Sequence, residues 1–289
     1  MKVFPFLLIL CSFFFSCGST DKKPAATEDG VTEKTLEAFA DSLVHLDKFS
    51  PESIDAAADY YKRLVPPDST LADSAAVMFL RHVSGVVDTI NQKLFQDTTD
   101  YYELVYNEST NAPEGQKRFK QNLERNHINL QADGEGGVYA VADYNWISSV
   151  LTSKTSAAVD AYLSLLTREE KTPALMDAGL AIEPAELADR LISSELLLQQ
   201  RLPKSFADDV AGRNKFYTGT LLFGSVNSPA LEYDPIALVE EYKKGYDYLL
   251  QKYPSSKAAQ LLKEWQTIVA AKDSKTIEEW KIRFNPYYE

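Results

Sequence analysis

The chain has 289 residues, of which 42 are acidic and 30 are basic, giving a formal net charge of −12 at pH 7. This acidic balance repels phosphate backbones, and no basic stripe offsets it, so we expect no nucleic-acid binding. A hydrophobic fraction of 45% can support a packed core, and the length suits one large or two small domains. Both cysteines lie within the first 17 residues, which leaves no pair for a disulfide in the rest of the chain.

The N-terminus has the pattern of an export signal. A lysine precedes the apolar run VFPFLLILCSFFF at 3–15, which is shorter than the roughly 20 residues of a membrane span. The sequence FFSCG at 14–18 resembles the lipobox of bacterial lipoproteins, in which a small residue precedes a cysteine that is acylated after cleavage. The resemblance implies lipid attachment, such as palmitate, at Cys17. Cys11 fits less well because a bulky leucine precedes it.

The alternative is an ordinary secretory signal that happens to contain cysteines. The sequence GSTDKKPAATEDG at 18–30 is small and polar, and such a composition favours a flexible tether over a folded segment. We therefore divide the chain into a signal peptide at 1–16, a tether at 17–31, an N-terminal helical segment at 32–127 and a C-terminal segment at 128–289. The last two segments can also form one domain.

Helical periodicity dominates after the tether. Apolar residues recur at intervals of three and four, which predicts amphipathic helices that bury one face. The predicted helices cover residues 33–48, 51–65, 70–96, 113–126, 155–166, 184–201, 235–252, 256–271 and 275–284. In addition, the capping-box spacing from Thr167 to Glu170 predicts the start of a further short helix.

One region departs from the helical pattern. Residues 128–144, INLQADGEGGVYAVADY, contain two alternating runs around a glycine-rich turn, which predicts a small β-hairpin. The hairpin marks the junction between the two helical segments. A glycine-rich phosphate loop is the alternative, but no Gly-Lys-Ser/Thr sequence follows the glycines.

Three predicted helix ends share a turn, in which a proline ends one helix and a serine two residues later caps the next. These turns begin at Pro67, Pro203 and Pro254. The third, in GYDYLLQKYPSSKAAQLL, resembles the interhelical turn of tetratricopeptide repeats, with Tyr246 at the aromatic position. Because the turns are irregularly spaced, we expect a mostly all-α fold of irregular stacked helical hairpins, TPR-like rather than a regular array.

Residues that could carry chemistry are scattered. His45, His82 and His127 lie far apart, so no metal site is predicted, and we interpret the first two as helix-surface or boundary residues. Neighbouring carboxylates such as Asp208 and Asp209 point in different directions on a helix and indicate solvated faces. No catalytic or cofactor-binding motif is present, so no catalytic residue and no cofactor is predicted.

Paired aromatic residues are the remaining candidates for a ligand surface, because adjacent residues on a helix cannot both face the core. The alternative is that these tyrosines fill helix–helix seams with their hydroxyls in water. Tyr144 and Trp146, beside the predicted hairpin, are the strongest candidates for ligand-facing side chains.

Two functions remain. The first is a non-catalytic helical scaffold, anchored to the bilayer through acylated Cys17 and bound to another envelope protein. The second is a solute- or glycan-binding lipoprotein that uses exposed aromatic residues. The residues after Cys17 suggest neither inner-membrane retention nor surface export. We therefore expect an outer-membrane lipoprotein that faces the periplasm.

Overall fold

The computed structural model describes residues 28–97, 99, 101–106, 112–233 and 236–284. The predicted signal peptide and Cys17 lie outside these residues. The fold is mostly helical, with 68% of the described residues in helices and small antiparallel strand pairs, which confirms the predicted fold class.

The helices are α1 (Glu28–Val44), α2 (Ser53–Leu64), α3 (Ser69–Gln96), α4 (Tyr102–Tyr106), α5 (Glu114–Arg125), α6 (Tyr144–Leu151), α7 (Ala157–Lys171), α8 (Pro184–Leu197), α9 (Lys204–Phe223), α10 (Glu240–Lys252), α11 (Lys257–Ala271) and α12 (Ser274–Phe284). The strands are β1 (Ile128–Ala132), β2 (Val138–Ala142), β3 (Leu175–Met176), β4 (Gly179–Leu180), β5 (Leu231–Tyr233) and β6 (Ile236–Leu238).

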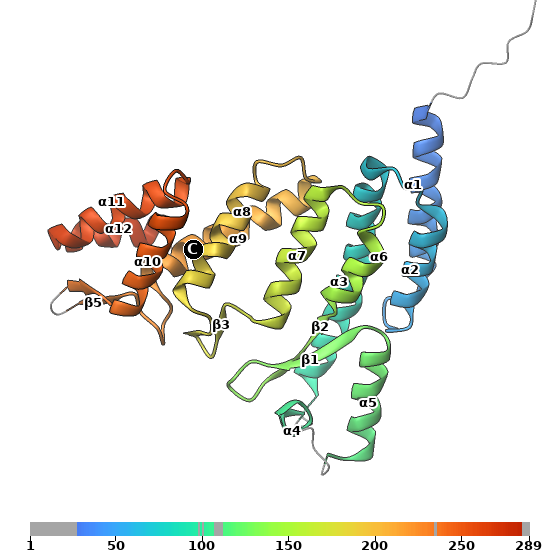
Figure 1. Ribbon diagram of the computed structural model, residues 1–289. Helices are drawn as coiled ribbons and strands as arrows, with labels where there is room; N and C mark the ends of the chain where they lie inside the picture. The colour runs from blue at the N-terminus through green and yellow to red at the C-terminus, as the bar shows by residue number, and fades with distance from the viewer. Residues whose placement is uncertain (1–27, 98, 100, 107–111, 234–235, 285–289) are drawn as a thin grey trace, which may run out of the picture.

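The elements follow one another along an elongated molecule, from α1 at one end to α11 and α12 at the other (Figure 1). Helices α1, α2 and α3 pack together, α6 packs on α7, and α8 packs on α7, α9, α10 and α11. Most contacts therefore join elements that are close in sequence, as in stacked helical hairpins.

The predicted hairpin is confirmed as β1 and β2, which pair antiparallel from Ile128 opposite Ala142 to Ala132 opposite Val138. Asp133 closes the turn by accepting hydrogen bonds from the amides of Glu135 and Gly137. Strand β2 lies against α3, and the side-chain amide of α3 residue Asn91 bonds both backbone groups of Ala140, at 3.0 and 2.6 Å. Asn91 thus takes the place of a neighbouring strand and fixes the hairpin to the helices.

Two further hairpins, β3–β4 and β5–β6, were not predicted. The turn of β3–β4 contacts its neighbours on both sides. The Asp177 amide donates to the Asp133 carbonyl at 3.3 Å, and the Asn227 side chain donates to the Asp177 carbonyl at 2.6 Å. These contacts join three loop tips, 133–137, 177–178 and 225–228, in a row that we call the hairpin-tip row, and the hairpins lie along one edge of the molecule (Figure 1).

Several predicted helix boundaries are wrong for identifiable reasons. The helix predicted at 235–252 begins only at Glu240, because residues 236–238 pair with β5. Helix α7 continues to Lys171, so no new helix begins at Thr167. Helix α1 begins at Glu28, inside the segment predicted as a tether.

Helices α4 and α6 were not predicted, and α9 was predicted only at its start, after the turn at Pro203. In α9 every residue from Tyr217 to Phe223 is buried, so its second half has no exposed face and no amphipathic period.

The serine cap predicted at three proline turns forms at one of them. Ser256 caps α11 by accepting from the Ala259 amide at 3.0 Å. At the first turn Asp68 caps α3 instead, through the amides of Thr70 and Leu71. At the second turn no side chain caps α9.

Buried aromatic residues form one cluster in each half of the core. In the N-terminal half, Tyr61 contacts both Phe39 and Phe79 with ring centroids 5.9 and 6.1 Å apart. In the C-terminal half, Trp265 stands edge-on to Phe223 at 4.9 Å. Large buried aromatics of this kind dominate the energetics of a core.

Candidate functional site: an apolar groove between α7 and α8

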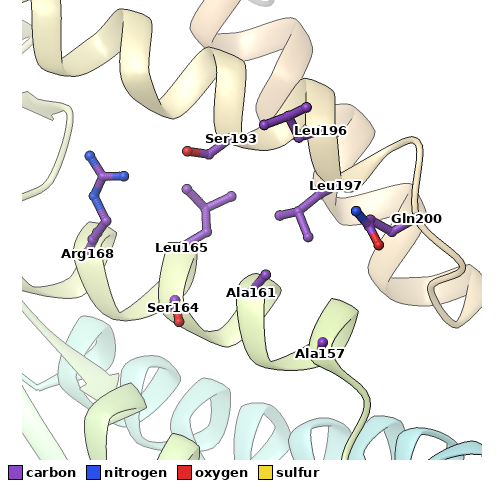
Figure 2. Close-up of a pocket in the computed structure, with 9 residues that line it drawn as sticks. All are labelled: Ala157, Ala161, Ser164, Leu165, Arg168, Ser193, Leu196, Leu197 and Gln200. Carbon is purple, nitrogen blue, oxygen red and sulfur yellow. The ribbon is translucent and has the colours of Figure 1, made fainter.

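An open groove of about 490 Å³ lies between α7 and α8. Except for Gln200, which follows α8, its lining residues come from α7 and α8, and Leu165 and Leu197 extend into the space between these helices (Figure 2). They are Ala157, Ala161, Ser164, Leu165, Arg168, Ser193, Leu196, Leu197 and Gln200. We call this feature the α7–α8 groove.

Residue size explains why the groove is open. Ala157 and Ala161 lie one turn apart on α7, and their methyl groups leave unfilled the space that a leucine would occupy. Leu165 and Leu197 form a buried floor, whereas Leu196 is 55% exposed. An exposed leucine beside small residues is an apolar surface that water covers in the isolated chain.

Arg168 is the only charged residue that lines the α7–α8 groove. It lies at one end, and its Nη2 is 2.7 Å from Glu186 Oε1 on α8. The rest of the lining is uncharged in a chain whose surface is strongly acidic.

A second depression, of about 630 Å³, shares Ala157 and Gln200 with the α7–α8 groove and extends it toward the start of α3. Its further lining includes Asp73 on α3 and Arg201 in the α8–α9 connection. Asp73 accepts a hydrogen bond from the Ser156 amide at 2.8 Å, which fixes the start of α7 beside α3.

The structure separates the two predicted ligand-facing aromatics. Trp146 is half-buried, with the His127 ring stacked on it at 3.7 Å and Phe79 at 6.4 Å. Tyr144 instead lines a pocket of about 230 Å³, which we call the Tyr144 pocket. Neither residue lines the α7–α8 groove.

The sequence led us to interpret His45 and His82 as helix-surface or boundary residues, and this interpretation holds for His45 only. His45 is exposed immediately after the end of α1. His82 is buried, and its Nε2 is 3.0 Å from Ser53 Oγ. Burial lowers the pKa of His82, and the nearby charge of Lys48 lowers it further. The helix-surface or boundary interpretation of His82 is therefore wrong, because α2 covers this part of α3 through Ser53.

A partly buried charge network joins α7, α8 and α9. Glu169 forms an ion pair with Arg213 and accepts a hydrogen bond from the Tyr217 hydroxyl. Arg190 is fully buried, with Nη1 3.8 Å from Glu169 Oε1. Burial raises the pKa of Tyr217 to about 12, so this hydroxyl remains a donor.

The interpretation of Asp208 and Asp209 as a solvated pair is also half correct. Asp208 is exposed beside Lys204 at 2.6 Å. Asp209 faces inward, where it accepts from the Tyr162 hydroxyl at 3.0 Å and from Arg213 Nε at 2.7 Å. Burial raises the pKa of Asp209, and the bond from Tyr162 opposes that rise.

Within the residues that the structure describes, no group of three or more histidine, cysteine, aspartate or glutamate side chains is placed to hold a metal ion. None of the described helices combines the length and hydropathy that a membrane span requires.

The sequence pattern did not single out the α7–α8 groove. The available signal was the spacing of small residues along α7, at 157, 161 and 164, which equally suits close helix packing. No family model matches the chain, and neither a curated protein nor a solved structure matches it.

Proposed function

We propose that the protein is a lipoprotein of the bacterial envelope whose helical domain binds another envelope protein without catalysing a reaction. Acylated Cys17 would hold it on the periplasmic face of the outer membrane, with the lipid bilayer as its second partner. The lipobox-like sequence at 14–18 and the polar sequence behind it support the anchor.

The observation that carries the binding role is the α7–α8 groove. Its lining residues repeat along two helices, which matches the way an amphipathic helix places its apolar side chains between two others. We therefore propose the apolar face of a partner's helix as the occupant. An acidic residue near one end of that helix would meet Arg168, the one charged group of the lining.

Fractionation of cells tests the anchor. The full chain is expected in the membrane fraction, and Cys17→Ala is expected in the soluble fraction, because the acyl chains can no longer be attached. Cys11→Ala is the matched control and should remain with the membrane. Membrane association of the Cys17→Ala protein would contradict the anchor.

Site-specific photo-crosslinking in cells tests the α7–α8 groove. A photoreactive residue at position 161 is expected to form one discrete adduct, and one at exposed Lys263 on α11 is not. Leu196→Glu should abolish the adduct because it places a charge in the apolar lining. Leu198→Glu changes an exposed leucine outside the lining and should preserve the adduct. An adduct that survives Leu196→Glu would rule the groove out.

A further inference from the structure

The Tyr144 pocket lies where four helices from different parts of the chain meet. Helix α3 contributes one face with spacing typical of a helix, and α6, α7 and α9 contribute the remainder. The lining residues are Val77, Leu80, Arg81 and Ser84 from α3, Tyr144 from α6, Tyr162 and Leu166 from α7, and Ser205, Phe206, Asp209 and Arg213 from α9. The pocket shares no lining residue with the α7–α8 groove.

Four polar side chains of the lining have no partner among the described residues. They are the guanidinium of Arg81 and the hydroxyls of Ser84 and Ser205, which belong to solvent-exposed residues, and the hydroxyl of half-buried Tyr144. All four can donate hydrogen bonds. Burial raises the pKa of the Tyr144 hydroxyl, which keeps it protonated as a donor. Water can hydrate these donors in the isolated chain, and a ligand that accepts hydrogen bonds can replace that water. A concave site that combines a few polar groups with apolar side chains is the usual form of a small-molecule site.

The other polar residues of the pocket are already fixed. Asp209 is held between the Tyr162 hydroxyl and Arg213, and the Tyr162 ring stacks on Phe206 with centroids 4.6 Å apart. These contacts leave little freedom in the wall, so the site is largely preformed. Arg81, Arg213 and Asp209 together give the lining a net charge of +1, in a chain whose net charge is −12.

We propose that the Tyr144 pocket binds a small carboxylate with an apolar or aromatic body. The Arg81 guanidinium matches a carboxylate in bidentate geometry, and the free hydroxyls supply further donors. The apolar body lies against Leu80, Leu166 and the Phe206 ring. The pocket volume of about 230 Å³ limits the ligand to the size of a single-ring compound. The site is independent of partner binding in the α7–α8 groove.

Ligand-observed NMR and calorimetry on the full-length protein in detergent, with benzoate as the probe, test the site. Saturable binding is expected for the wild-type protein. Arg81→Ala should weaken it by at least about tenfold, since a hydrogen bond to a charged group is lost. Tyr144→Phe, which removes only the hydroxyl, should weaken it by about fivefold.

Two controls make the result decisive. Arg118→Ala removes the same charge from an exposed position on α5 and should leave benzoate binding unchanged. Benzyl alcohol, which lacks the carboxylate, should bind more weakly than benzoate. The proposal is overturned if benzoate does not bind saturably, if Arg81→Ala and Arg118→Ala behave alike, if benzyl alcohol binds as well, or if inorganic phosphate binds in place of benzoate.

Discussion

At the scale of single residues, His82 is the titratable group whose surroundings most directly connect packing to pH. It lies in the middle of α3 beneath α2 and is paired with Ser53. Its folded-state pKa is lowered by burial first and by the charge of Lys48 second. The unfolded chain therefore binds a proton on this residue more readily than the folded chain does.

A lowered histidine pKa contributes stability that is present above the ordinary value of 6.5 and is lost as the pH falls below it. We therefore expect the urea midpoint to decrease between about pH 7.5 and about pH 5. His82→Gln keeps a partner for Ser53 but cannot titrate, so this decrease should be shallower in the variant. His45→Gln, at an exposed site, is the control. Identical slopes in the wild-type and His82→Gln proteins would contradict the assignment.

At the scale of elements, the ends of helices are held by side chains from distant parts of the sequence. Glu195 on α8 accepts hydrogen bonds from the amides of Lys257 and Ala258 in the first turn of α11, at 2.9 and 3.1 Å. Lys154, in the α6–α7 connection, donates to the carbonyls of Tyr61, Lys62 and Val65 at the end of α2. Both contacts satisfy backbone groups that a helix end leaves without partners.

Lys154→Met tests this kind of end capping. The methionine keeps the length of the side chain but leaves the carbonyls at the end of α2 without their donor. We expect a loss of about 1–3 kcal/mol in the free energy of unfolding, measured by urea denaturation. Lys171→Met, at an exposed position on α7, is the matched control and should change stability by less than about 0.5 kcal/mol. Equal effects of the two substitutions would refute the capping role.

The burial pattern of each element decides whether it can be predicted from the sequence. Helices with one buried stripe, such as α2 and α11, are predicted from their apolar period alone. Helix α9 is buried on all sides from Tyr217 to Phe223, so it has no such period. Strands β3 and β4 have two residues each and are fixed by neighbouring loops, which no local pattern records.

The Tyr144 pocket is only partly predictable from the sequence, because a local pattern identifies one of its residues and tertiary packing brings in the others. Tyr144 was identified because its neighbours are aromatic and because it lies beside a predicted hairpin. Arg81, Ser84 and Ser205 were not, because they face one another only after α3 and α9 have packed. Trp146 belongs to the same sequence pattern as Tyr144, but the His127 ring covers one of its faces. The positions of these residues in the sequence therefore identified the region of the pocket. They could not show which of the two aromatic side chains lines it.

At the scale of the whole molecule, the number of neighbours that each helix contacts determines where local unfolding begins. Helix α8 contacts α7, α9, α10 and α11, whereas α12 at the C-terminal end contacts α9 and α11. In a stack whose units contact mainly their neighbours, the central units are the most protected and the ends fray.

Hydrogen exchange measured by mass spectrometry tests this order. Amides of α8 should exchange most slowly, and those of α1 and α12 most quickly. Leu187→Ala in α8 and Ile277→Ala in α12 both remove a buried side chain, at a cost of about 2–5 kcal/mol. The first should increase exchange on both sides of α8, and the second only near the C-terminal end. An equal, chain-wide increase from both variants would show instead that the domain opens as one unit.

The hairpin-tip row also has a mechanical consequence. The β3–β4 hairpin connects the C-terminal end of α7 to the N-terminal end of α8, and its turn is bonded to the loop tips on either side. The row therefore restrains the connection between α7 and α8 at one end of these two helices. Ala157 and Gln200 mark the other end of the α7–α8 groove, where α7 begins and α8 has just ended. The hydrogen bond from the Ser156 amide to Asp73 holds the start of α7 beside α3 at this end, so the α7 wall of the groove is tied to other parts of the fold at both of its ends.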